Sequence, residues 1–229
     1  MKKCAVLLTA GFLFVLLNGT SPLSAKVYID IDSPGYRPLP VALFLLDSPS
    51  GSAACKVPQA RQTVLDVLKR DLEVSGFFRI LPSELFLVKP DEVSLYPEKI
   101  DFHAWSLIGA EALILLQLTC SDGQISCEVQ LLDVLTGKLL TWKRYRSTLA
   151  GSRKVAHKFA NEVEKALTGV EGAFDTKLAY ISNAGGSKEV FLMDYDGHDP
   201  RQMTHLNCIN LSPAWSPEGT MLAFTSYWK

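Results

Sequence analysis

The 229-residue sequence lacks the short motifs that mark the commonest enzyme classes. No glycine-rich phosphate-binding loop follows a predicted strand, no H-E-x-x-H pair is present, and no G-x-S-x-G segment supplies a nucleophilic serine. Its histidines are too scattered to share one helix face, and we interpret His103 and His157 as surface or helix-flank residues. The four are His103, His157, His198 and His205. The sequence therefore predicts no catalytic residue, no cofactor and no metal site.

Basic tracts are missing as well. Lysine and arginine together number 23 against 24 aspartates and glutamates, and the formal net charge is −1. Because nucleic acids and anionic membranes are bound through clusters of positive charge, nothing here favours either as a partner.

Long hydrophobic runs are limited to the N-terminus. Lys2 and Lys3 precede an apolar run, Ala5–Leu17, and small or polar residues then lead to Ala25. This pattern is typical of an export signal peptide over residues 1–25, cleaved between Ala25 and Lys26. This run is shorter than the about 20 apolar residues that a membrane span needs. We therefore interpret it as a cleavable leader and expect no membrane insertion after cleavage. An uncleaved anchor helix is the alternative. Removing the leader takes away two lysines, which leaves a formal charge of −3.

Cysteine is scarce, with five residues in the chain. Four follow the leader: Cys55, Cys120, Cys127 and Cys208. Export permits disulfides, and Cys120 and Cys127 flank a predicted hairpin turn. A four-residue loop, Asp122–Ile125, would align these two for a disulfide, whereas a two-residue turn at 122–123 would place Cys120 opposite Ile125 and leave both thiols free. The second closely spaced ligand pair of a zinc site is missing.

Residues 26–170 predict an α/β domain. Strict alternation over 26–32 indicates a strand with one apolar face, and the continuous apolar run 41–46 indicates a strand covered on both faces. Further strands are predicted over 77–81, 112–119, 126–135 and 139–145. Helices are predicted over 59–74, 100–110 and 155–167, the last ending at Gly169. Helix–strand alternation followed by an antiparallel meander favours a mixed sheet with helices packed on it.

Residues 171–229 predict an incomplete β-propeller. TKLAYIS at 176–182 is repeated as TMLAFTS at 220–226, a spacing within the range of propeller blades. Between the copies lie a predicted strand at 189–194, a turn at Asp196-Gly197 and an edge strand at 201–204. Prolines on both sides of Trp215 keep that segment extended. The chain thus carries one blade and the start of a second.

The acidic run 194–199 invites comparison with a calcium-binding loop. Such a loop ends on a glutamate, and the corresponding position holds His205. We therefore interpret Asp196-Gly197 as a turn that uses the positive φ angles of these residue types.

These segments together resemble the TolB family of the Tol–Pal envelope system. LAYISN, KEVFLMDYDG and LSPAWSPEGTMLAFTS carry the resemblance in the second part, and IDIDSPG, GFFRIL and AWSLIGAEALILLQLT carry it in the first. The resemblance covers essentially the whole chain after the leader. It implies a periplasmic, non-catalytic protein that links a TolA-like inner-membrane protein to a Pal-like outer-membrane lipoprotein and supports envelope integrity and cell division.

The resemblance also implies a TolA-binding segment at the N-terminus that cleavage creates. There, an alternating strand can detach from its own domain and pair with the edge of a partner's sheet. This segment comprises Lys26, Val27, Tyr28, Ile29, Asp30, Ile31, Asp32 and Ser33. A purely structural edge strand is the alternative. For the whole chain, the rivals are the N-terminal fragment of an exported propeller-containing peptidase and a propeller scaffold without Tol partners.

Overall fold

The computed structural model describes residues 37–47, 57–89, 93–121 and 123–229. The predicted leader with its cleavage site, the predicted binding segment 26–33 and Cys55 lie outside these ranges.

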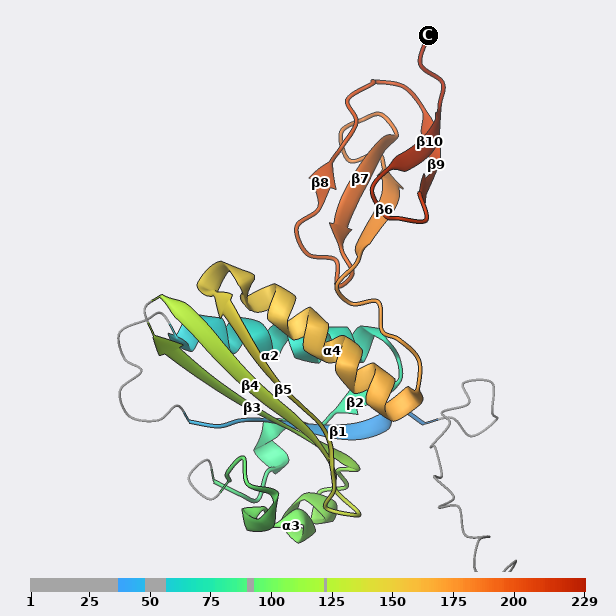
Figure 1. The fold of residues 1–229 in the computed structure, drawn as a ribbon. Helices are drawn as coiled ribbons and strands as arrows, with labels where there is room; N and C mark the ends of the chain where they lie inside the picture. The colour runs from blue at the N-terminus through green and yellow to red at the C-terminus, as the bar shows by residue number, and fades with distance from the viewer. Residues whose placement is uncertain (1–36, 48–56, 90–92, 122) are drawn as a thin grey trace, which may run out of the picture.

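The first part of the described chain is built on a five-stranded sheet with the order β2-β1-β3-β4-β5 (Figure 1). β1 runs parallel to β2 and to β3, whereas β3, β4 and β5 form an antiparallel meander. The strands are β1 Leu39–Leu45, β2 Phe78–Ile80, β3 Ala112–Ser121, β4 Gln124–Asp133 and β5 Leu139–Thr148. The predicted mixed sheet is confirmed.

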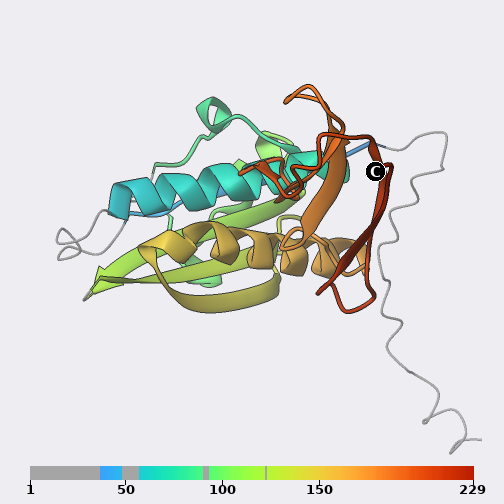
Figure 2. The same cartoon turned by 90° about the horizontal axis from the view of Figure 1, so that it is seen from above.

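Two long helices, α2 (Val57–Val74) and α4 (Ser152–Thr168), lie side by side on one face of this sheet (Figures 1 and 2). α4 ends as predicted, because Gly169 takes a left-handed conformation with φ 79° and its N–H donates to the Lys165 carbonyl. None of the helices within the described ranges is long and apolar enough to cross a membrane.

On the opposite face lies α3 (Phe102–Leu107), which is shorter than the helix predicted over 100–110. The Asp101 side chain accepts hydrogen bonds from the N–H groups of His103 and Ala104, so the helix begins there. Gly109, with φ 77°, follows its end. Within the described ranges, this part also contains short 3-10 turns at Ser83–Leu85, Pro97–Lys99 and Leu149–Gly151.

The sheet buries apolar side chains on both faces. On the α2/α4 face the core includes Ile114 and Phe159, and on the α3 face Trp105 is 1% exposed. The Trp105 ring meets Phe44 and Phe86 edge-on, with centroids 5.5 and 5.0 Å apart. The continuous apolar run of β1 is therefore covered on both sides, as its sequence predicted.

The second part of the chain consists of two small antiparallel sheets that stand on the α2/α4 side of the first part, away from α3 (Figure 1). One has the order β6-β7-β8, and the other pairs β9 with β10. Their bounds are β6 Lys177–Ser182, β7 Glu189–Asp194, β8 Arg201–Gln202, β9 Asn210–Trp215 and β10 Leu222–Ser226. The repeated sequence forms β6 and β10, in agreement with the predicted propeller-like strands.

The segment around Trp215 was predicted only to be extended, and it forms strand β9. Leu211 pairs with Thr225 and Ala214 with Ala223, so Ser212 and Pro213 together oppose a single residue of β10. Ser212 has φ 52°. This bulge allows a proline, which has no N–H to donate, to lie within a paired strand.

Candidate functional site

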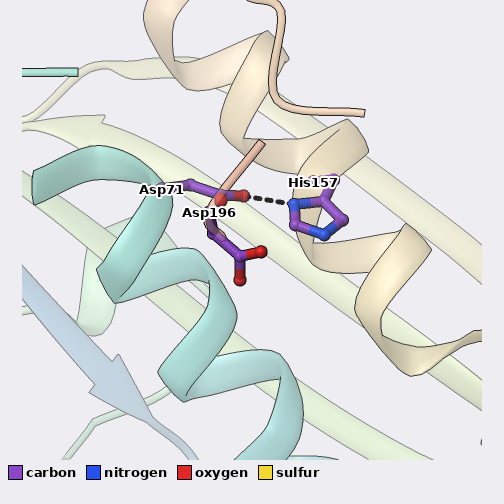
Figure 3. Close-up of side chains that lie close together, drawn as sticks. All are labelled: Asp71, His157 and Asp196. Atoms are coloured by element: carbon purple, nitrogen blue, oxygen red, sulfur yellow. Dashed lines mark hydrogen bonds and ion pairs between the residues drawn. The ribbon is translucent and has the colours of Figure 1, made fainter. Parts of the chain in front are cut away.

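Charged side chains gather where α2 and α4 meet the turn that follows β7. We call this group the junction cluster: Asp71 from α2, Arg153 and His157 from α4, and Asp194 and Asp196 from the end of β7 and its turn. Figure 3 shows Asp71, His157 and Asp196, which converge from these three elements.

The local sequence explains how each element presents its side chain. Arg153 and His157 are four residues apart, so they lie one turn apart on the same side of α4. Gly197, with φ 84°, closes the turn after β7, and its N–H donates to the Asp194 carbonyl at 2.9 Å. The His198 N–H donates to Asp196 Oδ1 at 3.1 Å, which orients that carboxylate. The turn predicted at Asp196-Gly197 is therefore present.

Hydrogen bonds and ion pairs connect the two parts of the chain through this cluster. The Nη2 atom of Arg153 lies 2.7 and 2.9 Å from the two carboxylate oxygens of Asp196 and 3.4 Å from Asp194. Lys177 Nζ donates to Asp194 at 2.5 Å. Beside them, the Phe174 and Tyr195 rings pack edge-on with centroids 5.2 Å apart. Polar and apolar contacts thus fix the turn against α4.

Within the helices, Asp71 and His157 form a buried pair. Asp71 Oδ2 and His157 Nδ1 lie 2.7 Å apart, with Asp71 fully buried and His157 only 5% exposed. Asp71 Oδ1 and His157 Nε2 are buried without a hydrogen-bond partner among the residues that the structure describes. Each is a polar atom that calls for a physical explanation.

Burial and neighbouring charges act differently on the three carboxyl groups. Burial raises the pKa of Asp71, although the hydrogen bond with His157 opposes this effect. Burial alone would also raise the pKa of Asp194 and Asp196. The pKa of Asp194 is nevertheless below its usual value because of Lys177, and that of Asp196 because of Arg153. Both turn carboxylates are therefore stabilised as anions.

The interpretation of His157 as a surface or helix-flank residue was wrong. Its helix packs against both the sheet and α2, so its buried face is wider than the stripe of Val155, Phe159 and Val163 indicated. The carboxylate that shares a hydrogen bond with His157 belongs to Asp71, 86 residues away in the chain, and no local sequence pattern predicts so distant a partner. His103, by contrast, is exposed at the start of α3, as predicted.

The disulfide considered between Cys120 and Cys127 is not formed. Ser121 pairs with Gln124 and Cys120 with Ile125, whereas Cys127 lies opposite Leu118. This register follows from the tight turn rather than the four-residue loop. Cys120 is disulfide-bonded, though not to Cys127, which is a free and fully buried thiol. Burial raises the pKa of Cys127 to about 12, so this thiol is unreactive near neutral pH.

A second candidate surface lies on the face of the sheet opposite α2 and α4, beyond the area that α3 covers. A depression of about 810 Å³ is lined there by Tyr96, Glu128, Trp142 and Arg144, among others. Glu128 accepts hydrogen bonds from Trp142 Nε1 at 2.8 Å and from Arg144 at 2.8 and 3.1 Å. These hydrogen bonds fix Trp142 and Arg144 of the edge strand β5 against Glu128 of the neighbouring strand β4.

The fold defines a two-part protein in which a mixed α/β domain precedes the first strands of a propeller. Comparison with known families supports both parts: the TolB amino-terminal domain matches residues 27–140, and the TolB beta propeller domain matches residues 164–229.

Relatives with matching sequences are named Tol-Pal system protein TolB. That of Desulfosudis oleivorans is 35% identical over 202 residues, covering 88% of this chain and 46% of the relative. That of Syntrophotalea carbinolica is 36% identical over 207 residues, covering 90% and 47%. The crystal structure of TolB from Acinetobacter baumannii aligns with a TM-score of 0.67 and 19% identity over 89% of this chain and 48% of that one, which shows a shared fold.

The chain belongs to the TolB family. It spans about half the length of the curated relatives that it matches.

Proposed function

We propose that this protein is a non-catalytic, periplasmic component of the Tol–Pal system that binds a TolA-like inner-membrane protein and a Pal-like outer-membrane lipoprotein. The observation that carries the proposal is the succession, in one chain, of the two parts that characterise the TolB family. Through these contacts the protein would support outer-membrane integrity and cell division.

For the TolA-like partner, the proposed contact is the segment from Lys26 to Ser33. Its alternating sequence suits a strand that pairs along the edge of another sheet, where backbone hydrogen bonds give affinity and side chains give specificity. For the Pal-like partner, the proposed contact is the propeller, of which this chain carries the first strands. The junction cluster supports the proposal because it connects the α/β part, which follows the proposed TolA-binding segment in the sequence, with the first propeller strands.

An exported propeller-containing peptidase is the rival function. The relatives named above are Tol–Pal proteins, and this observation favours the binding role. Since this chain contains no G-x-S-x-G segment, the rival would have to carry its nucleophile in a further domain.

Replacing residues 26–33 with a glycine–serine segment of equal length tests the proposal. We expect TolA pull-down to be lost while the thermal unfolding temperature changes little, since chain ends contribute little to stability. The matched control is a glycine–serine replacement of residues 48–52, a Pro/Gly/Ser-rich loop sequence outside the proposed segment. Normal TolA binding by the 26–33 variant, or unfolding of the domain, would contradict this role.

A further inference from the structure

We infer that the depression on the sheet face opposite α2 and α4 is a binding site for a neutral saccharide. Two exposed aromatic side chains that line it, Trp142 and Tyr96, stack on the sugar rings, and polar side chains of the sheet bind the hydroxyl groups. Its volume of about 810 Å³ lies within the range of ligand-binding sites, about 300–1,000 Å³. This site goes beyond the proposed function, which concerns protein partners alone.

The pairing of β3, β4 and β5 brings the polar side chains of the site together (Figure 1). Gln117 of β3 lies opposite Glu128 of β4, and Glu128 lies opposite Arg144 of β5. Gln130 and Trp142 form the next pair with the same orientation. Because side chains two residues apart on a strand share a face, all five lie on one side of the sheet, where they line the depression.

The Trp142 ring is exposed but held in position. Its Nε1 atom donates to Glu128 Oε1 at 2.8 Å, and the central guanidinium carbon of Arg144 lies 5.4 Å from the ring centroid. Arg144 is itself fixed by two hydrogen bonds to Glu128 Oε2. The ring nevertheless remains 46% exposed. A ring that is already ordered loses little conformational freedom when a ligand stacks on it, which favours binding.

The segment that carries Tyr96 is tied to the same sheet face. Gln130 Nε2 donates to the Leu95 carbonyl at 3.0 Å, and the Gln130 side chain is buried. Since a carbonyl oxygen only accepts, this bond fixes the orientation of the amide group. Tyr96, the next residue, is 62% exposed. The hydrogen bond therefore holds a second aromatic side chain beside the depression.

This combination of side chains matches the two kinds of surface that a sugar presents. The face of an aromatic ring carries partial negative charge, which attracts the C–H groups on the apolar face of a pyranose. Each sugar hydroxyl both donates and accepts hydrogen bonds. The Glu128 carboxylate is an acceptor, the Arg144 guanidinium is a donor, and the Gln117 amide is both.

The charges around the depression are balanced, and this favours a neutral ligand. Among the described residues that line it, the charged ones are Asp47, Glu128 and Arg144. Glu128 pairs with Arg144 at 2.8 Å, and Asp47 lies 3.6 Å from Arg61. A phosphate or carboxylate would compete with these pairs. Neutral hydroxyl groups can share them, because a carboxylate has about four lone-pair positions and a guanidinium has further N–H donors.

Saturation-transfer NMR and isothermal calorimetry of the purified protein with two neutral trisaccharides test the site. Chitotriose carries acetamido groups, whereas maltotriose carries hydroxyl groups alone, so the pair distinguishes an amino-sugar source from a plain hexose source. We expect one or both to bind with a dissociation constant of about 1 mM or lower. About 0.5 M salt should leave the affinity unchanged, because the ligand is uncharged.

Trp142→Ala should weaken this binding at least about fivefold, because it removes a stacking ring. The matched control is Trp228→Ala, which removes an exposed tryptophan outside the depression and should bind as the wild type does. If Trp142→Ala disturbs the sheet, Tyr96 provides a second test. Tyr96→Ala should lose affinity and Tyr96→Phe should keep it, because the ring rather than the hydroxyl stacks.

Three results would overturn the proposal. They are the absence of binding of either trisaccharide to the wild type at about 10 mM, wild-type affinity in both Trp142→Ala and Tyr96→Ala, and an equal loss of affinity in Trp228→Ala.

Discussion

The residues on the two sides of Gly169 bury their apolar side chains in very different ways. Before it, the sheet is covered on both faces, and Leu113, Ile114, Leu115 and Leu116 of β3 are all fully buried. Across residues 177–229, all of which the structure describes, Val190 is the single apolar side chain in the buried core. In this second part, Trp215, Met221 and Trp228 are 38%, 68% and 70% exposed.

The strands after Gly169 are held instead by polar contacts. Glu189 on β7 accepts hydrogen bonds from the Thr204 hydroxyl at 2.5 Å, the Asn207 N–H at 2.7 Å and Asn210 Nδ2 at 3.1 Å. Glu189 and Asn210 are buried, so this network connects β7 with β9 and with the segment between β8 and β9 in a protected position. A propeller blade normally covers its faces with neighbouring blades. Local strand pairing therefore sets the shape of this second part, whereas the packing of apolar side chains in the core stabilises the α/β part.

The largest difference should appear when one aromatic residue is truncated in each part. Trp105→Ala should lower the free energy of unfolding by about 3–5 kcal/mol, because it empties a closed core. Phe224→Ala on β10 should cost less than about 1 kcal/mol, because its side chain is already partly exposed. Urea denaturation followed by circular dichroism measures both. Equal losses would show that the two parts are equally well packed.

Arg153→Met should loosen the second part while leaving the first intact. Hydrogen bonds to charged groups contribute about 1.5–3 kcal/mol, and this variant removes those that hold Asp194 and Asp196 against α4. Limited proteolysis of the wild type should cut between Val170 and Lys229 and leave a resistant core, and the variant should be cut there faster.

Arg146→Met, at the exposed face of β5, is the matched control and should be cut at the wild-type rate. A wild-type monomer that resists the protease along its whole length would remove the distinction between the two parts.

Acid should abolish the contribution of Asp196. Its pKa in the folded protein lies below the ordinary value of 3.8, so its stabilising effect is present above that value and disappears as pH falls through the folded pKa. The unfolding temperatures of the wild type and Asp196→Asn should therefore differ at pH 6 and converge once the pH falls below the folded pKa of Asp196. Burial raises the pKa of Asp71 and acts in the opposite direction, but Asp71 is common to both proteins. A difference that persists in acid would refute the ion-pair account.

The smallest effect is expected for Lys177→Met. Lys177 is about half exposed and pairs with Asp194 at 2.5 Å, and exposed ion pairs contribute about 0.2–1 kcal/mol. The protease should cut this variant only slightly faster than the wild type, and 0.5 M salt should remove the difference. Lys188→Met, at an exposed residue directly before β7, is the control. An effect as large as that of Arg153→Met would mean that Lys177 and Arg153 share the anchoring role.

The sequence by itself determined those elements that a local rule specifies. The apolar run that forms β1, the repeat that forms β6 and β10, Gly169 at the end of α4 and the Asp196-Gly197 turn all express a local rule. Such patterns can be recognised in the sequence because they depend only on local geometry. Each residue type suits one face of its own strand or helix, or the backbone angle that its own turn requires.

Only the tertiary structure decided which distant residues meet. His157 and Asp71 share a hydrogen bond across 86 positions, and the pairing register of β3 with β4, rather than cysteine spacing, kept Cys120 and Cys127 apart. Asp196 looked like a turn residue and is also the partner of Arg153. These contacts depend on how α2, α4 and the β7 turn pack against one another. Packing between elements produces no periodic pattern in the sequence of any single element.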